Sequence, residues 1–111
     1  MIGARLRDMA ARHPSVGEVR GLGFLWAIEL VRDPATRERL VPFQGTAAQN
    51  APMAQVVAAV TAGGVWPFPQ VNRLHLAPPL VTSVEDLEHG LDVIDAALDV
   101  ADRYVVDPSP T

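Results

Sequence analysis

The chain has 111 residues, of which 49% are hydrophobic, and its formal net charge is −4. This length suits one domain with one core. The acidic balance and the lack of a basic run argue against a nucleic-acid partner. The absence of cysteine excludes disulfides, thiolate catalysis and cysteine-ligated zinc.

All nine cationic residues are arginine, so the chain has no lysine that could form a Schiff base. No apolar run approaches the roughly 20 residues that span a bilayer. The amino terminus lacks the basic and then apolar pattern of a signal peptide. We therefore expect a cytoplasmic protein with no membrane partner.

The first part of the chain predicts a helix and two strands. Apolar residues recur at helical spacing over 2–12, and Pro14 ends this helix. Residues 18–22 and 24–31 read as strands, with a sharp turn or bulge at the glycines between them. Both faces of 24–31 are largely apolar, which predicts a strand covered on both sides.

A polar stretch broken by prolines, 32–49, predicts a long loop. Asn50 can cap a helix that ends at the glycine pair 63–64. A brief strand is expected over 65–68, and a second alternating strand begins at residue 72.

The last helix carries the clearest signals. Thr82 and Glu85 have the spacing of a capping box. Alternating steps of three and four residues then define an apolar stripe. The stripe consists of Val84, Leu87, Leu91, Ile94, Leu98, Ala101 and Val105.

This order of elements predicts an α+β fold. We expect a small, mainly antiparallel sheet of three to four strands with helices packed on one face. One domain would cover residues 1–105, followed by a disordered tail over 106–111.

The strand that begins at residue 72 carries the leading candidate residue. Side chains alternate along a strand, so Arg73 and His75 share one face while Leu74 and Leu76 share the other. Arg73 could make a surface ion pair worth at most about 1 kcal/mol. It could instead clamp a carboxylate with its planar donor fork. The residues alone favour the ion pair.

The other polar groups favour structural roles. His13, His75 and His89 lack metal-ligand spacing, and only His75 shares a face with Arg73. The glycine pair 21 and 23 lacks a third glycine and a following helix, so it reads as a turn and not as a phosphate cradle. The acids of the last helix read as a solvated face. The four aromatics Phe24, Trp26, Trp66 and Phe68 read as core or interface.

Several stretches resemble the carboxy-terminal small domain of class III aminotransferases, the pyridoxal-phosphate enzymes of fold type I. They are VRGLGFLWAIEL at 19–30, GGVWPF at 63–68, NRLHLAPPL at 72–80 and the start of the helix at 82–85. The resemblance covers residues 1–105 in the family's order. The sequence around Trp66 and Arg73 most resembles that of the branch that acts on ω-amino acids or taurine.

The resemblance implies that Arg73 binds a substrate carboxylate, because the matching arginine does so in that family. The family's Schiff-base lysine, its aspartate at the pyridine nitrogen and its phosphate-binding residues lie in a large domain that this sequence does not resemble. No catalytic, cofactor-binding or metal-binding residue is therefore expected in this chain. Pyridoxal phosphate would not be bound covalently here.

The implied function is one part of an amino-group transfer between an amino acid or ω-amino acid and a 2-oxo acid. The partner would be the missing large domain or a full-length aminotransferase subunit, in a dimer or another homo- or hetero-oligomer. The chain alone would be inactive. Two alternatives stay open: a non-catalytic dimerisation or regulatory module, and a truncated remnant. The mutually consistent caps, turns and periodicity argue against a decayed remnant.

Overall fold

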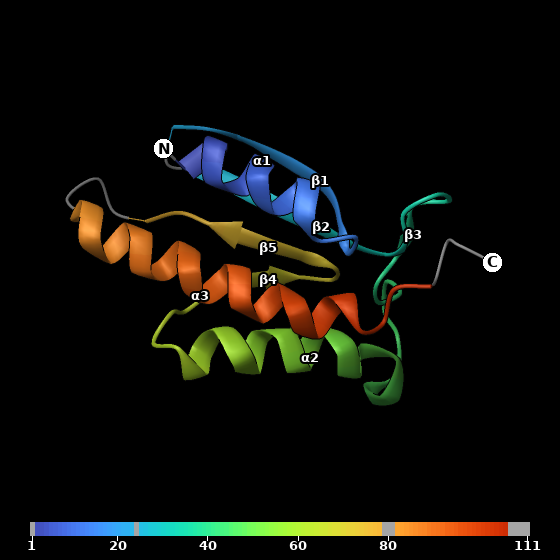
Figure 1. The fold of residues 1–111 in the computed structure, drawn as a ribbon. Helices are drawn as coiled ribbons and strands as arrows, with labels where there is room; N and C mark the ends of the chain where they lie inside the picture. Colours follow the sequence, from blue (N-terminus) through green and yellow to red (C-terminus); the bar gives the residue numbers. More distant parts are fainter. Residues whose placement is uncertain (1, 24, 79–81, 107–111) are drawn as a thin grey trace.

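The computed structural model describes residues 2–23, 25–78 and 82–106 (Figure 1). These residues form three helices and five strands. In order they are α1 (Ile2–Arg12), β1 (Val16–Leu22), β2 (Leu25–Asp33), β3 (Glu38–Arg39), α2 (Ala47–Ala62), β4 (Phe68–Gln70), β5 (Arg73–Leu76) and α3 (Val84–Asp102).

The strands form one antiparallel sheet in the order β1-β2-β5-β4, and the two-residue β3 also pairs with β2. The central strand β2 therefore has β1 along one edge and β5 along the other. Two hairpins, β1–β2 and β4–β5, lie next to each other in the sheet. This confirms the predicted α+β fold; the short strand β3 was not predicted.

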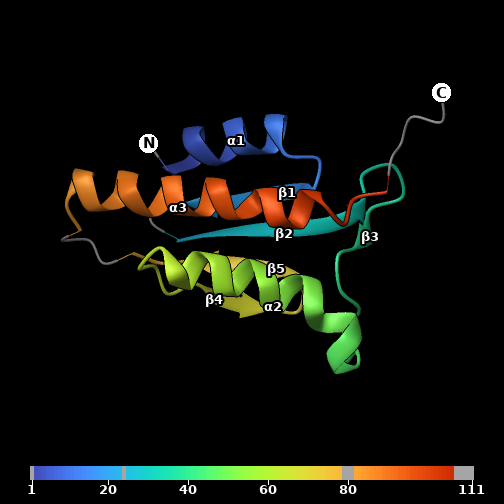
Figure 2. The same ribbon diagram turned by 60° about the horizontal axis from the view of Figure 1, so that its bottom comes forward.

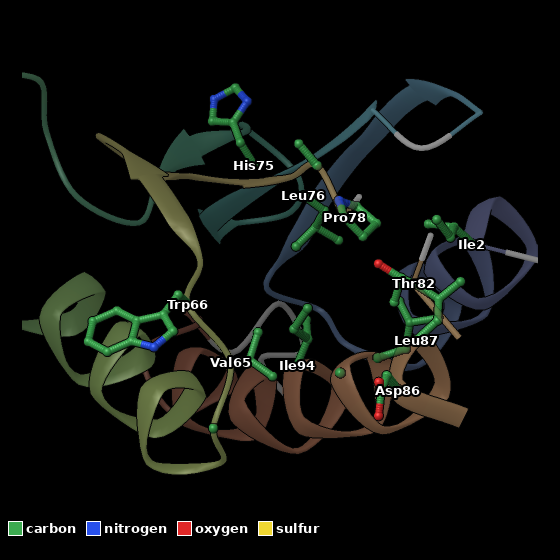
Figure 3. Close-up of a pocket in the computed structure, with 14 residues that line it drawn as sticks. Ile2, Val65, Trp66, His75, Leu76, Pro78, Thr82, Asp86, Leu87 and Ile94 are labelled. Atoms are coloured by element: carbon green, nitrogen blue, oxygen red, sulfur yellow. The ribbon is translucent and has the colours of Figure 1, made fainter. Parts of the chain in front are cut away.

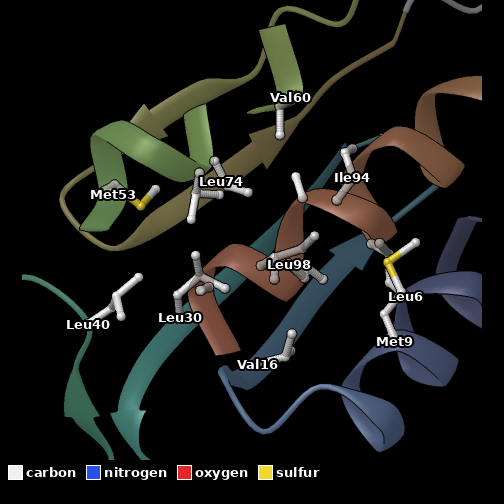
Figure 4. Packing of buried hydrophobic residues seen from close by; sticks show 14 of the residues in the cluster. Leu6, Met9, Val16, Leu30, Leu40, Met53, Val60, Leu74, Ile94 and Leu98 are labelled. Carbon is white, nitrogen blue, oxygen red and sulfur yellow. The ribbon is translucent and has the colours of Figure 1, made fainter. Parts of the chain in front are cut away.

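The helices cover one face of the sheet, with α3 running beside both α1 and α2 (Figures 1 and 2). Alternation along β2 and β5 places Ile28, Leu30 and Leu74 on this face, and each is at most 1% exposed. Side chains of all three helices close over them (Figure 4). These include Leu6, Met9, Met53, Val56, Val60, Leu91, Ile94 and Leu98. One continuous core thus holds the sheet to the helical layer.

The glycines near the β1–β2 turn are explained by Trp26. A side chain on Gly21 would collide with the Trp26 ring, and so would one on Gly3 of α1. The indole Nε1 donates to the Gly23 carbonyl at 2.7 Å. Gly23 itself has φ +60°, a left-handed conformation that costs glycine little. The structural interpretation of these glycines is confirmed.

None of the described helices packs on the other face of the sheet (Figure 2). Leu25 is 66% exposed there but Val31, on the same side, is 1% exposed, so the prediction that β2 is covered on both sides is wrong for the start of the strand and not for Val31. Cross-strand partners share a face. The register Leu22–Leu25 places Leu22 beside Leu25 on this open face, and the registers Ala27–His75 and Phe68–His75 place Phe68 on the same face, two strands away from β2.

Two predicted boundaries need correction in the middle of the chain. The expected loop 32–49 contains β3 and the fully buried Leu40 and Val41. The expected strand 65–68 begins only at Phe68 and continues to Gln70. The apolar pair at 40–41 lies within a mostly polar stretch, so the sequence pattern predicted a loop there.

Both later helices have different caps from those predicted. The α2 helix begins after Thr46, whose side chain and that of Gln49 form a reciprocal capping box, and not after Asn50. In α3 the cap is Ser83, whose hydroxyl accepts from the Asp86 amide at 3.1 Å, and not Thr82. The predicted and observed caps are four residues apart in α2, Asn50 and Thr46, and adjacent in α3, Thr82 and Ser83.

The carboxyl end of the described chain is attached to the sheet. The Val106 amide donates to the Arg32 carbonyl at 2.8 Å, although residue 106 was expected in a disordered tail. Residues 107–111 of that tail lie outside the described residues. None of the helices described is long and apolar enough to cross a bilayer.

Candidate functional site

Arg73 is the first residue of β5 and lies opposite Glu29 of β2 on the open face. The predicted alternation is confirmed, since Leu74 is fully buried while Arg73 and His75 are partly exposed. The preceding turn includes Val71 at φ +55°. A β-branched residue is strained in this region, so the surrounding structure must hold the turn in place.

Asn72 holds that turn against the central strand. Its carbonyl accepts from the Leu30 amide at 2.8 Å, and its side-chain Nδ2 donates to the Leu30 carbonyl at 2.7 Å. The residue is 2% exposed, and its side chain shares the Leu30 carbonyl with the Leu40 amide, which donates at 3.2 Å. Because Asn72 directly precedes Arg73, these two hydrogen bonds fix the backbone of Arg73 against β2.

Arg73 lines a cavity of about 550 Å³ on the open face. Three arginines and one glutamate contribute to the wall, and their formal charges sum to +2. The lining residues are Arg20, Glu29, Arg39, Phe43, Gln70, Val71, Asn72 and Arg73. Sequence reasoning missed Arg20 and Arg39, because their approach to Arg73 depends on strand pairing between distant segments.

The arginines of this cavity differ in their partners. Arg20 donates to Glu18 at 2.8 Å and approaches Glu29 at 3.4 Å. Within the part of the chain that the structure describes, neither Arg39 nor Arg73 has a side-chain hydrogen bond or ion pair. The ion-pair interpretation of Arg73 is therefore not supported by a described partner. An unpaired guanidinium fork on a cavity wall can bind a carboxylate with two parallel hydrogen bonds.

His75 lies on the same face as Arg73 but outside this cavity. Its ring meets Phe68 edge to face, with centroids 6.1 Å apart. A separate, largely apolar cavity of about 390 Å³ lies between β5 and the start of α3. His75 is one of the residues that line it, and Figure 3 shows the His75 ring directed away from Leu87 and Ile94, which line the same cavity. The arrangement supports a packing role for His75.

The strongest polar cluster lies elsewhere, between α1 and α3, and sequence reasoning missed it. His13 is 5% exposed, and its two ring nitrogens lie 2.6 Å from Asp95 and 2.6 Å from Asp102. Ser15 donates to Asp102 through both its amide and its hydroxyl. Asp95 and Asp102 are seven residues apart, hence on one side of the helix, and this spacing was the available signal.

Hydrogen bonds within this cluster favour the charged forms of His13, Asp95 and Arg12. Burial alone lowers the pKa of His13, but the hydrogen bonds that its ring makes to the carboxylates of Asp102 and Asp95 outweigh burial and raise that pKa. The hydrogen bond from Arg12 lowers the pKa of Asp95, with His13 contributing and burial opposing. Arg12 donates to both Asp95 and Asp8, and these hydrogen bonds raise the pKa of Arg12. The prediction that these acids form only a solvated face is wrong for Asp95 and Asp102.

Three of these side chains, His13, Asp99 and Asp102, have ligand atoms close enough together to hold a metal ion. However, both ring nitrogens of His13 already meet carboxylates, and Asp99 is largely exposed at 3.7 Å. The contacts explain the cluster as an ion-paired connection between α1 and α3. His89 is exposed and its ring Nε2 lies 3.2 Å from the Gly63 carbonyl.

No family model matches the chain. Individual known proteins are similar to it over most of its length. A taurine–pyruvate aminotransferase of Rhodobacter capsulatus is 38% identical over 86% of this chain and 20% of its own length. An (R)-1-hydroxy-2-aminoethylphosphonate ammonia-lyase of Vibrio splendidus is 32% identical over 85% of this chain and 18% of its own.

Solved structures show the same likeness. A taurine:2-oxoglutarate aminotransferase of Bifidobacterium kashiwanohense, in complex with PLP and glutamate, superposes with a TM-score of 0.84. The identity is 28%, and the match covers 95% of this chain and 23% of that one. The chain thus spans about a fifth of the length of the proteins it matches.

The relatives' cofactor can be tested against the residues present here. Covalent attachment of pyridoxal phosphate requires a lysine, and the sequence contains none. The cation-rich cavity suits a carboxylate, but this chain's residues do not fit the covalent attachment of that cofactor. The α+β fold, the match over most of this chain and the partial coverage of each relative agree. In sequence and in fold, the chain corresponds to the carboxy-terminal region of the class III pyridoxal-phosphate aminotransferases.

Proposed function

We propose that this chain supplies the substrate-carboxylate site of a pyridoxal-phosphate-dependent aminotransferase, with Arg73 as the binding residue. The amino group would pass between an amino acid or ω-amino acid and a 2-oxo acid. Cofactor attachment and proton transfer would reside in a large domain that carries the lysine. The chain alone is then inactive.

The observation that carries this proposal is the state of Arg73. Its guanidinium lines an open-face cavity with a net positive wall, and no described side chain pairs with it. Its backbone is fixed through Asn72 on the central strand. A positioned and unpaired arginine is the arrangement that bidentate carboxylate binding needs.

The test combines this chain with a polypeptide that carries the large domain of a class III aminotransferase. Taurine or β-alanine serves as amino donor and pyruvate as acceptor. We expect turnover only when both chains are present. In the mixture, Arg73→Gln should raise the KM for the carboxylate substrate by about 10- to 100-fold, since a hydrogen bond to a charged group contributes about 1.5–3 kcal/mol.

Arg103→Gln is the matched control, because it removes one exposed arginine outside the cavity and should leave the KM unchanged. An unchanged KM in Arg73→Gln would refute the role of Arg73. This chain with pyridoxal phosphate alone should give no internal-aldimine absorbance band, because no lysine side chain is present.

A second candidate function, association with another subunit, is favoured by a different observation. Leu22, Leu25 and Phe68 lie on the open face with 87%, 66% and 63% of their surface exposed. Clustered apolar exposure of this kind is typical of an interface. Its test belongs to the whole molecule and is argued in the Discussion.

A further inference from the structure

The two edges of the sheet differ in length and chemistry. The strand order β1-β2-β5-β4 leaves β1 and β4 as the outer strands (Figure 1). The β4 strand has three residues and includes Pro69, which lacks the amide hydrogen needed for further pairing. The β1 strand has seven residues without proline, and no described strand pairs with its outer side. It therefore offers free backbone groups to another strand.

The hairpin register shows which backbone groups of β1 point outward. Leu22 pairs with Leu25 across a two-residue connection, so these two residues exchange both backbone hydrogen bonds. Hydrogen-bonded pairs alternate along an antiparallel ladder, so Arg20, two residues earlier, also bonds to β2. The N–H and C=O groups of Val19 and Gly21 therefore point to the free edge.

Two opposite charges alternate with these outward groups. Arg20 donates to Glu18 at 2.8 Å, and their side chains are 48% and 41% exposed. Because this pair joins residues of one strand at the surface, each side chain can also meet a charge on an added strand. The Gly17 carbonyl accepts from the Arg37 side chain at 3.1 Å, so it too lies away from β2.

Three antiparallel registers let Val19 face an outward-pointing residue of a second copy of this chain. If Val19 faces Gly17, Glu18 lies opposite Glu18; if it faces Gly21, Arg20 lies opposite Arg20. Like charges directly opposite each other are destabilising. If Val19 faces Val19, Glu18 of each copy lies opposite Arg20 of the other, and one two-fold axis gives two favourable pairs. Charge thus selects one register.

We propose that β1 pairs antiparallel with β1 of a second copy about a two-fold axis at Val19, which joins the two sheets edge to edge. The contact uses the edge and not the open face, so it is independent of Arg73 and of the exposed Leu25 and Phe68. A contact through one strand covers less than the roughly 800 Å² per partner of a stable complex. The dimer should therefore be weak and depend on concentration.

The first experiment reverses the two charges separately and measures association by sedimentation velocity over a concentration series. Glu18→Arg places only basic residues at the contact, and Arg20→Glu places only acidic ones. Each variant alone should associate at least about tenfold more weakly than the unmodified chain. In an equimolar mixture opposite charges face each other again, so association should recover. Open-face association is common to mixed and separate samples, so the gain on mixing reports on the edge.

Glu88→Arg and Arg103→Glu are the matched controls, because they make the same charge changes at exposed positions outside β1. Their mixture should show no gain over the separate samples. Circular dichroism checks that each variant is folded. An absent gain on mixing the β1 variants, or an equal gain for the control pair, would overturn the proposal.

A second experiment tests the register without reversing a charge. The chain has no cysteine, so Glu18→Cys and Arg20→Cys each introduce a single thiol. In the proposed register the two positions form a non-hydrogen-bonded pair with Cα atoms about 4.5 Å apart, which a disulfide can bridge. With oxidised glutathione, an equimolar mixture should give a crosslinked dimer. Each variant alone should give at least about tenfold less, because identical positions are offset by two residues.

Glu88→Cys mixed with Arg20→Cys is the control and should crosslink no more than the separate variants. Efficient crosslinking of Glu18→Cys alone or of Arg20→Cys alone would assign one of the other registers and contradict the proposed axis. Equal yields from the mixture and the separate variants would likewise rule out this pairing. These outcomes decide the proposal even where a charge-reversal variant does not fold.

Discussion

At the scale of single residues, His13 joins the end of α1 to α3. It lies directly after α1, and its ring contacts Asp95 and Asp102 on α3, with Asp99 at 3.7 Å and Arg12 sharing Asp95. Removing one partner of such a buried group leaves unpaired carboxylates. The ion pairs thus supply the polar part of a junction whose apolar part is formed by Leu6 and Met9.

This cluster predicts a defined pH dependence. The raised pKa of His13 means that its stabilisation is complete below the ordinary value of 6.5 and is lost as pH rises through the higher folded value. The lowered pKa of Asp95 adds stability that is present above its ordinary 3.8 and is lost as pH falls through the folded value. Thermal stability should therefore decline on both sides of this window.

The variant His13→Gln should remove the loss on the alkaline side and lower stability by about 2 kcal/mol near pH 6, because hydrogen bonds to charged groups contribute on that order. His89→Gln, on the exposed side of α3, keeps the cluster and should keep the decline. Unfolding curves against pH give the comparison. The same alkaline decline in His13→Gln would show that other groups cause it.

At the scale of elements, the sequence predicts where helices and strands occur better than where they begin. The α1 helix matches its prediction because Pro14 forces an end after Arg12. The start of α3 is off by one residue, because Thr82–Glu85 and Ser83–Asp86 have the same spacing. Local chemistry cannot choose between these two caps; the choice comes from how the apolar stripe meets the sheet.

This ambiguity gives a direct test. Ser83→Ala should cost about 1 kcal/mol, because it removes the acceptor for the Asp86 amide. In a domain of this size that corresponds to a fall in Tm of roughly 4–8 °C. Thr82→Ala serves as the matched control and should change Tm little. A larger effect at Thr82 than at Ser83 would restore the cap expected from the sequence.

At the scale of the whole molecule, the sequence could predict Arg73 but not its neighbours. Alternation within one strand is a local property, so the faces of β5 could be deduced. The approach of Arg20 and Arg39 depends on the pairing of β1, β3 and β5 with β2, which links residues far apart in the chain. The His13 cluster likewise depends on contacts between residues far apart in the chain, here between the end of α1 and α3.

The open face divides into two parts with different chemistry. The arginine cavity lies at the β4–β5 turn, and the exposed apolar residues Leu22, Leu25 and Phe68 lie toward the β1–β2 turn. Burying an exposed leucine contributes about 1.5–3 kcal/mol, so a partner that covers this apolar part gains substantially. We expect the pure chain to self-associate through it as concentration rises.

The variant Leu25→Asp should shift the chain toward the monomer by placing a charge in that contact. Its own stability should change by no more than about 0.5 kcal/mol, because Leu25 lies on the surface. Val84→Asp, which alters a 62% exposed residue on α3, is the matched control and should leave association unchanged. Light scattering over a concentration series measures the outcome. A chain that stays monomeric throughout, or one that associates equally well as Leu25→Asp, would refute an interface on the open face, whereas a selective effect of Leu25 would assign one.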